Sequence, residues 1–132
     1  MAEVLILQAN GYWNSMGTAL FTAVQLKGMG VDIAILFNEA AIAALAENKF
    51  DMSPPLAKYT ATIKENMKKM GLSTDIMDFV KLAKSAGVPL YACAFWPDFL
   101  GVRGKLPPEI QAMEMVGMMK LIAEAKRIIG AL

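Results

Sequence analysis

The sequence predicts one α/β domain of three layers, in which helices cover both faces of a parallel sheet of four strands. Short runs that are apolar throughout alternate with stretches whose apolar residues recur at helical spacing. Runs without polar alternation are typical of parallel strands buried on both faces, and intervening helices supply the crossovers that such strands need. We expect strand order 2-1-3-4, with the switch point between the first and third strands.

The first half of the chain alternates strand and helix. The predicted elements are a strand over 3–9, a loop over 10–14, a helix capped by Ser15 and ending near Gly28 or Gly30, a strand over 31–37, and a helix from Asn38 to about Asn48. Ser and Asn favour the position before a helix, because their side-chain oxygens accept hydrogen bonds from its first turn. The 10–14 loop lacks both the glycine-rich dinucleotide fingerprint and the Walker pattern.

The second half begins with an excursion over 49–70 that is longer than a usual connection. The predicted elements are a helix over about 56–70 closed by Gly71, a helix capped by Ser73 or Thr74 and ending at Gly87, a strand over 88–93, a helical turn over 97–100, a strand over 110–116, and a last helix over 118–129. The sequence leaves open whether the excursion is a lid or a contact between subunits.

The only cysteine, Cys93, ends the third predicted strand. In open α/β sheets, ligands bind at the carboxyl ends of the strands, so this position favours a functional thiol. The alternative is a small buried hydrophobe, since free cysteines are among the most buried residues. The predicted strand order brings Cys93 and the 10–14 loop into one crevice, with Asn38 and Glu39 at its flank.

Five polar or aromatic residues near this edge are candidates to line a pocket. They are Asn10, Tyr12, Asn14, Asn38 and Glu39. The asparagines can bind a small ligand, or they serve only the local hydrogen bonds of a turn. Glu39 is either a functional carboxylate or a residue matched to the helix dipole.

The length and amino-acid composition of the chain limit which partners it is expected to bind. The 132 residues suit one domain, and 13 basic against 12 acidic residues give a net charge of +1, which does not favour a nucleic-acid partner. Hydrophobic residues make up 56% of the chain and charged residues 19%. This apolar excess predicts a homo-oligomer, because the chain has more apolar side chains than one small core absorbs.

The chain contains no histidine. Histidine-based nucleophile arrangements and the usual zinc sites are therefore excluded, and we expect neither a metal nor a cofactor. No apolar run approaches the length of a membrane span, and the start of the sequence lacks the basic region of a signal peptide. With a single cysteine, which cannot form an internal disulfide, these features predict a cytoplasmic protein without membrane contact.

Three segments carry a resemblance to a known family. A helix ends in Lys-Ser-Ala-Gly at Gly87, the strand Val-Pro-Leu-Tyr-Ala-Cys follows to Cys93, and Leu100–Val102 reads Leu-Gly-Val. With Met67–Gly71 upstream and the order of elements, they make the chain similar to the DsrE/DsrF-like family of small sulfur-relay proteins. The similarity extends over most of 1–132, which we therefore treat as one domain of this kind.

The resemblance implies a flavodoxin-like domain that assembles as a trimer or hexamer. Cys93 matches the family cysteine that carries a persulfide, passed to or from a TusA-type carrier. At Trp96 the family often has a small polar residue, so a bulkier and more apolar pocket is expected here. Whether such a protein is an enzyme, a sulfurtransferase, or only a persulfide carrier stays open.

Sulfur transfer needs a thiolate, which nearby cations and backbone dipoles favour. Arg103 is either an electrostatic helper for Cys93 or a solvated loop residue, and Trp96 with Phe95 and Tyr12 can wall off the site. Two rival hypotheses remain. One is a module that binds a nucleotide or another small ligand in the same crevice. The other is a non-catalytic oligomer in which Cys93 is structural.

Overall fold

The computed structural model describes residues 2–130 and contains one sheet of five parallel strands. In space the strands follow the order β4-β3-β2-β1-β5. Their bounds are β1 Val4–Gln8, β2 Ile33–Phe37, β3 Leu90–Ala92, β4 Gln111–Ala112 and β5 Arg127–Ile129. The parallel α/β class predicted from the sequence is therefore confirmed.

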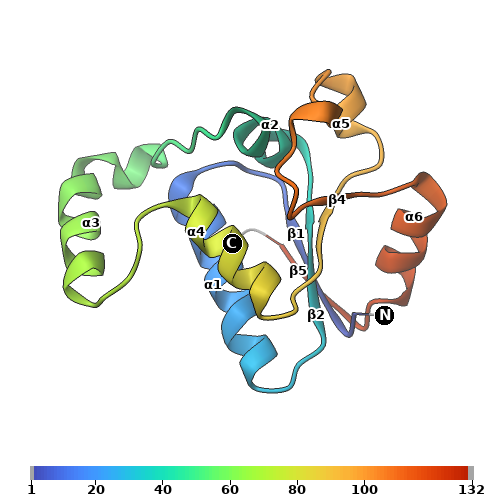
Figure 1. The fold of residues 1–132 in the computed structure, drawn as a ribbon, viewed down its shortest axis with the longest axis horizontal. Helices are drawn as coiled ribbons and strands as arrows, with labels where there is room; N and C mark the ends of the chain where they lie inside the picture. Colours follow the sequence, from blue (N-terminus) through green and yellow to red (C-terminus); the bar gives the residue numbers. More distant parts are fainter. Residues whose placement is uncertain (1, 131–132) are drawn as a thin grey trace.

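Helices cover the sheet on both sides (Figure 1). The α-helices are α1 Trp13–Gly28, α2 Glu39–Glu47, α3 Thr60–Lys69, α4 Ile76–Ser85, α5 Trp96–Phe99 and α6 Met115–Glu124, and the two 3-10 helices are η1 Pro54–Tyr59 and η2 Arg103–Lys105. Helices α1 and α4 lie together on one side of the sheet and α6 lies on the other. The excursion after β2 carries η1 and α3 to the far edge of the domain.

Two separate cores follow from the alternation of side chains along each strand. Val4 and Ile6 of β1 point toward α1 and α4, whereas Leu5 points toward α6. In the same way Leu90 and Ala92 of β3 join the first core, and Cys93 joins the second. The α6 face is the smaller core, and it is the one that contains the thiol.

The predicted number and order of strands, four in the order 2-1-3-4, are wrong. Residues 127–129, assigned to the last helix, form β5, which pairs with β1 from Val4↔Arg127 to Ile6↔Ile129. This strand occupies the edge of β1 at which the third strand was expected, so β3 pairs with β2 instead. A strand as short as Arg127–Ile129, with two apolar residues, carries no periodicity that separates it from one more helical turn.

The predicted strand over 110–116 is also largely wrong. Only Gln111 and Ala112 pair with β3, and α6 begins at Met115. Methionine is a good helix former, and Met115, Met118, Met119 and Ile122 follow helical spacing, which favours the helix. The last helix therefore begins earlier than expected and ends at Glu124, before β5.

Helix ends were predicted unevenly. Gly71 and Gly87 follow α3 and α4 with φ of 76° and 86°, a left-handed conformation suited to glycine, as expected. The predicted caps Ser15 and Ser73 or Thr74 are wrong: α1 begins at Trp13, and Asp75 caps α4 by accepting from the Met77 N–H at 3.0 Å. Along residues 2–130, no helix is both long and apolar enough to cross a bilayer.

Candidate functional site

Cys93 lies at the carboxyl end of β3, directly after its last residue. The Cys93 N–H donates to the Phe37 carbonyl at 3.0 Å, so the residue is fixed beside the end of β2. Its side chain belongs to the core under α6, together with Leu36 and Met118, and no part of it is exposed. The thiol is free, and in the single chain it is inaccessible to solvent.

Met118 of α6 helps to close the site from above. The backbone N–H of Ala94, the residue after the cysteine, donates to Met118 Sδ at 3.4 Å. A thioether is a weak acceptor, so this contact adds little energy, but it places α6 directly over the thiol segment. The sequence analysis did not single out Met118, and the helical spacing of the methionines was the signal that could have placed it here.

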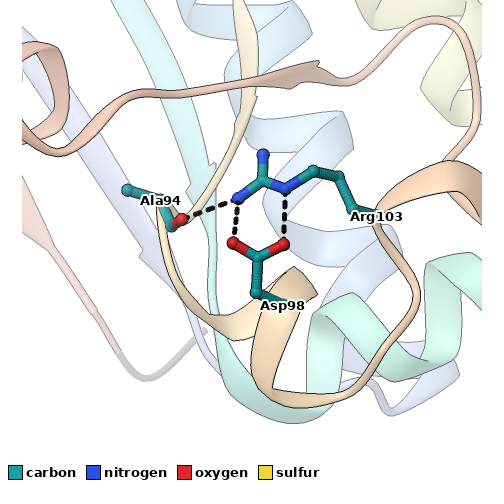
Figure 2. Close-up of polar contacts among 3 residues, drawn as sticks. All are labelled: Ala94, Asp98 and Arg103. Atoms are coloured by element: carbon teal, nitrogen blue, oxygen red, sulfur yellow. Dashed lines mark hydrogen bonds and ion pairs between the residues drawn. The ribbon is translucent and has the colours of Figure 1, made fainter.

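Arg103 closes the loop that follows Cys93 (Figure 2). Its Nε donates to Asp98 Oδ1 at 2.7 Å and its Nη2 donates to Asp98 Oδ2 at 3.0 Å. This is a bidentate pairing of the guanidinium with the carboxylate. The same Nη2 donates to the Ala94 carbonyl at 2.7 Å. We call this set of three bonds the Arg103 clamp. It ties the end of the loop to the residue next to the thiol.

The clamp shifts the ionisation of both partners. The hydrogen bond from Arg103 holds the pKa of Asp98 below its ordinary value of 3.8, with burial acting against it. The hydrogen bond to Asp98 raises the pKa of Arg103. Because Arg103 also bonds the Ala94 carbonyl, its guanidinium lies beside the residue that follows Cys93.

The pKa of Asp98 gives a direct test of the clamp. We expect the Asp98 carboxyl to titrate below 3.8 in the wild type and to return toward that value in Arg103→Gln. Because the folded pKa is depressed, the pairing stabilises the folded state above the unfolded pKa, and this contribution is lost as pH falls through the folded pKa. NMR titration of the Asp98 carboxyl carbon measures this pKa in the wild type and in Arg103→Gln, with Lys105→Gln as the control. An unchanged Asp98 pKa in Arg103→Gln would contradict the clamp.

The aromatic wall expected around the thiol is partly present. Phe95 and Trp96 are half-buried and pack against the core that holds Cys93. The ring centroid of Phe99 lies 5.4 Å from those of both Phe95 and Trp96. Tyr12 is exposed and is not among the residues of this core. The wall therefore comes from the loop after β3 alone.

The loop over 10–14 and Cys93 follow strands that are not neighbours, because β2 lies between β1 and β3. Asn10 Oδ1 accepts from the Tyr12 N–H at 3.1 Å, and Asn14 Oδ1 accepts from the Ser53 N–H at 2.9 Å. Both asparagines thus make the local or connecting hydrogen bonds of the simpler hypothesis. The crevice expected between this loop and the thiol rested on a strand order that the structure does not have.

Asn38 and Glu39 lie nearer the thiol, at the end of β2. Asn38 precedes α2 as expected, but its side chain makes no capping bond and instead donates from Nδ2 to the Leu36 carbonyl at 3.4 Å. Glu39 is exposed and has a φ of 48°, an uncommon left-handed conformation for a residue other than glycine. Helix α2 contacts α5, so these residues flank the clamped loop.

Gln8 is a buried polar residue that the sequence analysis did not single out. Its Nε2 donates to the Asn10 carbonyl at 3.1 Å and to Ser15 Oγ at 2.8 Å, and these bonds shape the loop after β1. Within residues 2–130, Gln8 Oε1 has no hydrogen-bond partner. A lone Gln at the end of an apolar strand gave no signal of this role.

The fold and the site together define a single parallel α/β domain with one buried thiol at the carboxyl edge of its sheet. No protein-family model matches the chain, and no curated protein matches it significantly. Solved structures do share the fold. The ychN protein from E. coli aligns with 15% identity over 99% of this chain and 100% of its own, with a TM-score of 0.62.

A second solved structure is a conserved protein of unknown function, BT1422 from Bacteroides thetaiotaomicron. It aligns with 14% identity over 97% of this chain and 93% of its own, with a TM-score of 0.67. At such low identity, both likenesses establish the fold alone. They extend over nearly the whole of each chain, so the chain has the dimensions of these proteins.

Proposed function

We propose that this protein is a sulfur-relay protein that accepts sulfane sulfur on Cys93 and passes it on as a persulfide. The observation that carries the proposal is the position of the thiol, at the carboxyl end of β3 and next to Ala94, whose carbonyl accepts from Arg103. Ligands and reacting groups gather at this edge of parallel sheets. The resemblance of the segment around Cys93 to the DsrE/DsrF-like family supports the same assignment.

The transfer is a pair of thiolate displacements. The Cys93 thiolate attacks the outer sulfur of a donor persulfide, a sulfur–sulfur bond forms at Cys93, and the donor leaves as a thiolate. An acceptor thiolate then attacks the outer sulfur on Cys93 and releases the Cys93 thiolate. No external oxidant or reductant is consumed, because the sulfane sulfur keeps its oxidation state throughout.

Burial of Cys93 sets a condition on this function. In this proposal the donor reaches the thiol when the loop over 94–103 moves away from α6, and this loop contains the four-residue helix α5 with the exposed Phe99. Short segments with little buried surface open locally at low free-energy cost. A closed loop would also shield a persulfide from solvent and from other thiols between the two steps.

The same burial favours a second candidate, a non-catalytic oligomer in which Cys93 is a structural core residue. A fully buried free cysteine behaves as a small hydrophobe and stays inert. The two candidates differ in one measurable property, which is whether the native thiol can react. A nucleotide-binding role has less support, since the loop after β1 contains a single glycine, Gly11.

Incubation with glutathione persulfide should add one sulfur atom to the wild-type protein, and a reductant should remove it. Cys93 is the only cysteine, so Cys93→Ser should take up none. Intact-mass spectrometry of the native protein measures both. Cys93→Ala serves as a second variant that places no polar group in the core, so that loss of uptake is not confused with loss of folding.

Two results would overturn the proposal. One is a wild-type protein that stays unmodified by the persulfide and also by a small thiol reagent, which would establish the structural cysteine. The other is sulfur uptake that persists in both Cys93 variants. Far-ultraviolet circular dichroism and thermal melting confirm in each case that the variant is folded.

We further propose that the chain works as a homo-oligomer, a trimer or hexamer, with a TusA-type carrier as donor or acceptor in the cytoplasm. The described surface supports assembly on the α6 side. Met115, Val116 and Met119 are exposed on α6, and Ile128 is exposed on the neighbouring edge strand β5. Large apolar side chains gathered in this way are typical of surfaces that another protein covers.

A further inference from the structure

A second candidate site lies on the α1–α4 side of the sheet, away from Cys93. It is a cavity of about 360 Å³ between α1, α4 and the η1–α3 excursion. Ligand pockets usually measure roughly 300–1,000 Å³, so the volume is sufficient for a small molecule. The cavity is lined by Trp13, Asn14, Gly17, Thr18, Phe21, Leu56, Ile63, Met67, Leu72, Ile76 and Phe79.

The walls of this cavity are mostly apolar, with Asn14 and Thr18 as polar lining residues and no charged side chain among those that line it. Phe21 and Phe79 meet edge to face with ring centroids 6.4 Å apart, which gives one wall a fixed shape. The opposite wall comes from Ile63 and Met67 of α3, which are only half-buried. Helix α3 makes its main contacts with η1 rather than with α1 or α4, so it does not fill the space beneath it.

The cavity is partly open to solvent, and buried residues form its floor. Trp13, Ile76 and Phe79 line it, with 8%, 2% and 6% of their surface exposed. The polar groups beside this space favour a small ligand over a second copy as the occupant.

One cation lies at this cavity. Lys64 Nζ is 5.6 Å from the centre of the Trp13 ring, and Lys64 is half-buried, whereas Lys58, Lys68 and Lys69 on the same excursion are exposed. Within residues 2–130, no carboxylate lies within 4.0 Å of Lys64. The cation therefore rests on an aromatic face and has no anionic partner of its own.

One amide donor is also uncommitted. Asn14 lines the cavity, and its Oδ1 accepts from the Ser53 N–H at 2.9 Å. In the part of the chain that the structure describes, Asn14 Nδ2 makes no hydrogen bond. Lys64 and Asn14 together offer a charged donor and a neutral donor next to an apolar space, which is the combination that a carboxylate with an apolar tail requires.

We propose that this cavity binds a small carboxylic acid with an apolar chain, such as a medium-chain fatty acid. The chain lies between the aromatic side chains and α3, and the carboxylate pairs with Lys64 and Asn14. This inference goes beyond the sulfur relay and does not depend on it, because Cys93 belongs to the other core. It assigns the long excursion after β2 the role of a lid, one of the two roles that the sequence left open.

Titration of the wild-type protein with octanoate, followed by isothermal calorimetry, tests this proposal. We expect saturable binding with a Kd on the order of 100 μM, and about tenfold weaker binding of octanol, which has the same chain without the charge. In Lys64→Met, which keeps the stem and removes the cation, octanoate should bind about tenfold more weakly and octanol should be unaffected.

Glycine substitutions in α1 supply a matched pair of variants. A Cβ on Gly17 would lie 3.7 Å from Ile76 Cδ1, an ordinary contact, so Gly17→Leu places its side chain in the cavity without backbone strain. Octanoate affinity should fall at least about tenfold. Gly28→Leu is the control on the same helix, where a Cβ meets nothing within 4 Å, and its affinity should stay at the wild-type value.

The proposal is overturned if octanoate gives no saturable heat, if Gly17→Leu binds as tightly as Gly28→Leu, or if Lys64→Met leaves the preference over octanol unchanged. A drop in molecular mass on Gly17→Leu, without any octanoate binding by the wild type, would also overturn it and identify the cavity as a contact between subunits. Gly17→Ala, which should raise the melting temperature, checks that this position accepts a side chain.

Discussion

Replacing Arg103 with alanine should speed the reaction of Cys93 with a small thiol reagent by about tenfold or more. The thiol is fully buried, so its reaction rate reports how often the loop over 94–103 opens. Arg103 donates three hydrogen bonds that hold this loop closed, two to Asp98 and one to the Ala94 carbonyl. Without them the open form becomes more populated, and the reagent gains access.

Two further variants separate the effect of the Arg103 clamp from the effect of the positive charge of Arg103. Arg103→Lys keeps the cation but loses the two-pronged geometry, so its rate should lie between those of the wild type and Arg103→Ala. Lys105→Ala removes a nearby cation that makes no hydrogen bond among the described residues, and it should react like the wild type. Equal rates for Arg103→Ala and Lys105→Ala would show that the clamp does not govern access to Cys93.

If the proposed homo-oligomer forms through α6, introducing a charge on the outer face of α6 should reduce it to a single chain of 14.3 kDa. Val116 and Met119 are 68% and 47% exposed there, in a chain with an unusual apolar excess. A glutamate at Met119 buried between subunits would lack a partner, and burying an unpaired charge is strongly unfavourable. Size-exclusion chromatography with light scattering at micromolar concentration measures the mass.

Met70→Glu is the matched control for this experiment. Met70 is 73% exposed at the end of α3, on the other side of the sheet, so the same change there should leave the assembly intact. A wild-type protein that already has the mass of one chain would contradict the prediction, as would dissociation in both variants. The distinction tests the α6 face specifically, rather than the tolerance of the fold to charge.

Much of the fold followed from local sequence signals. The first three strands were predicted within a few residues, because each is a continuous apolar run bounded by a loop or a glycine. The neighbours of a strand have no such local signal. The position of β3 depended on the short strand β5, which competes for the edge of β1, and that competition is decided by packing across the whole sheet.

The candidate site was predicted in the same uneven way. Placing Cys93 at the end of a strand required only the run before it and the turn after it. Its burial could not be predicted, because it depends on Met118, which packs over the thiol from the last helix, and no local signal places that helix over the end of β3. The pairing of Asp98 with Arg103 joins residues five apart in an irregular loop, a spacing that no helix or strand rule favours.

The pairing of β5 with β1 bears on how the chain reaches its native state. Strands β1, β2 and β3 each pair with the next strand in sequence, whereas Val4 of β1 pairs with Arg127 of β5 across nearly the whole chain. Contacts between such distant residues form late, because closing a long loop loses more entropy. Until β5 docks, one edge of the apolar strand β1 is an open template for other chains. Aggregation during refolding is therefore expected to begin at Val4–Gln8 rather than at the two-residue edge strand β4.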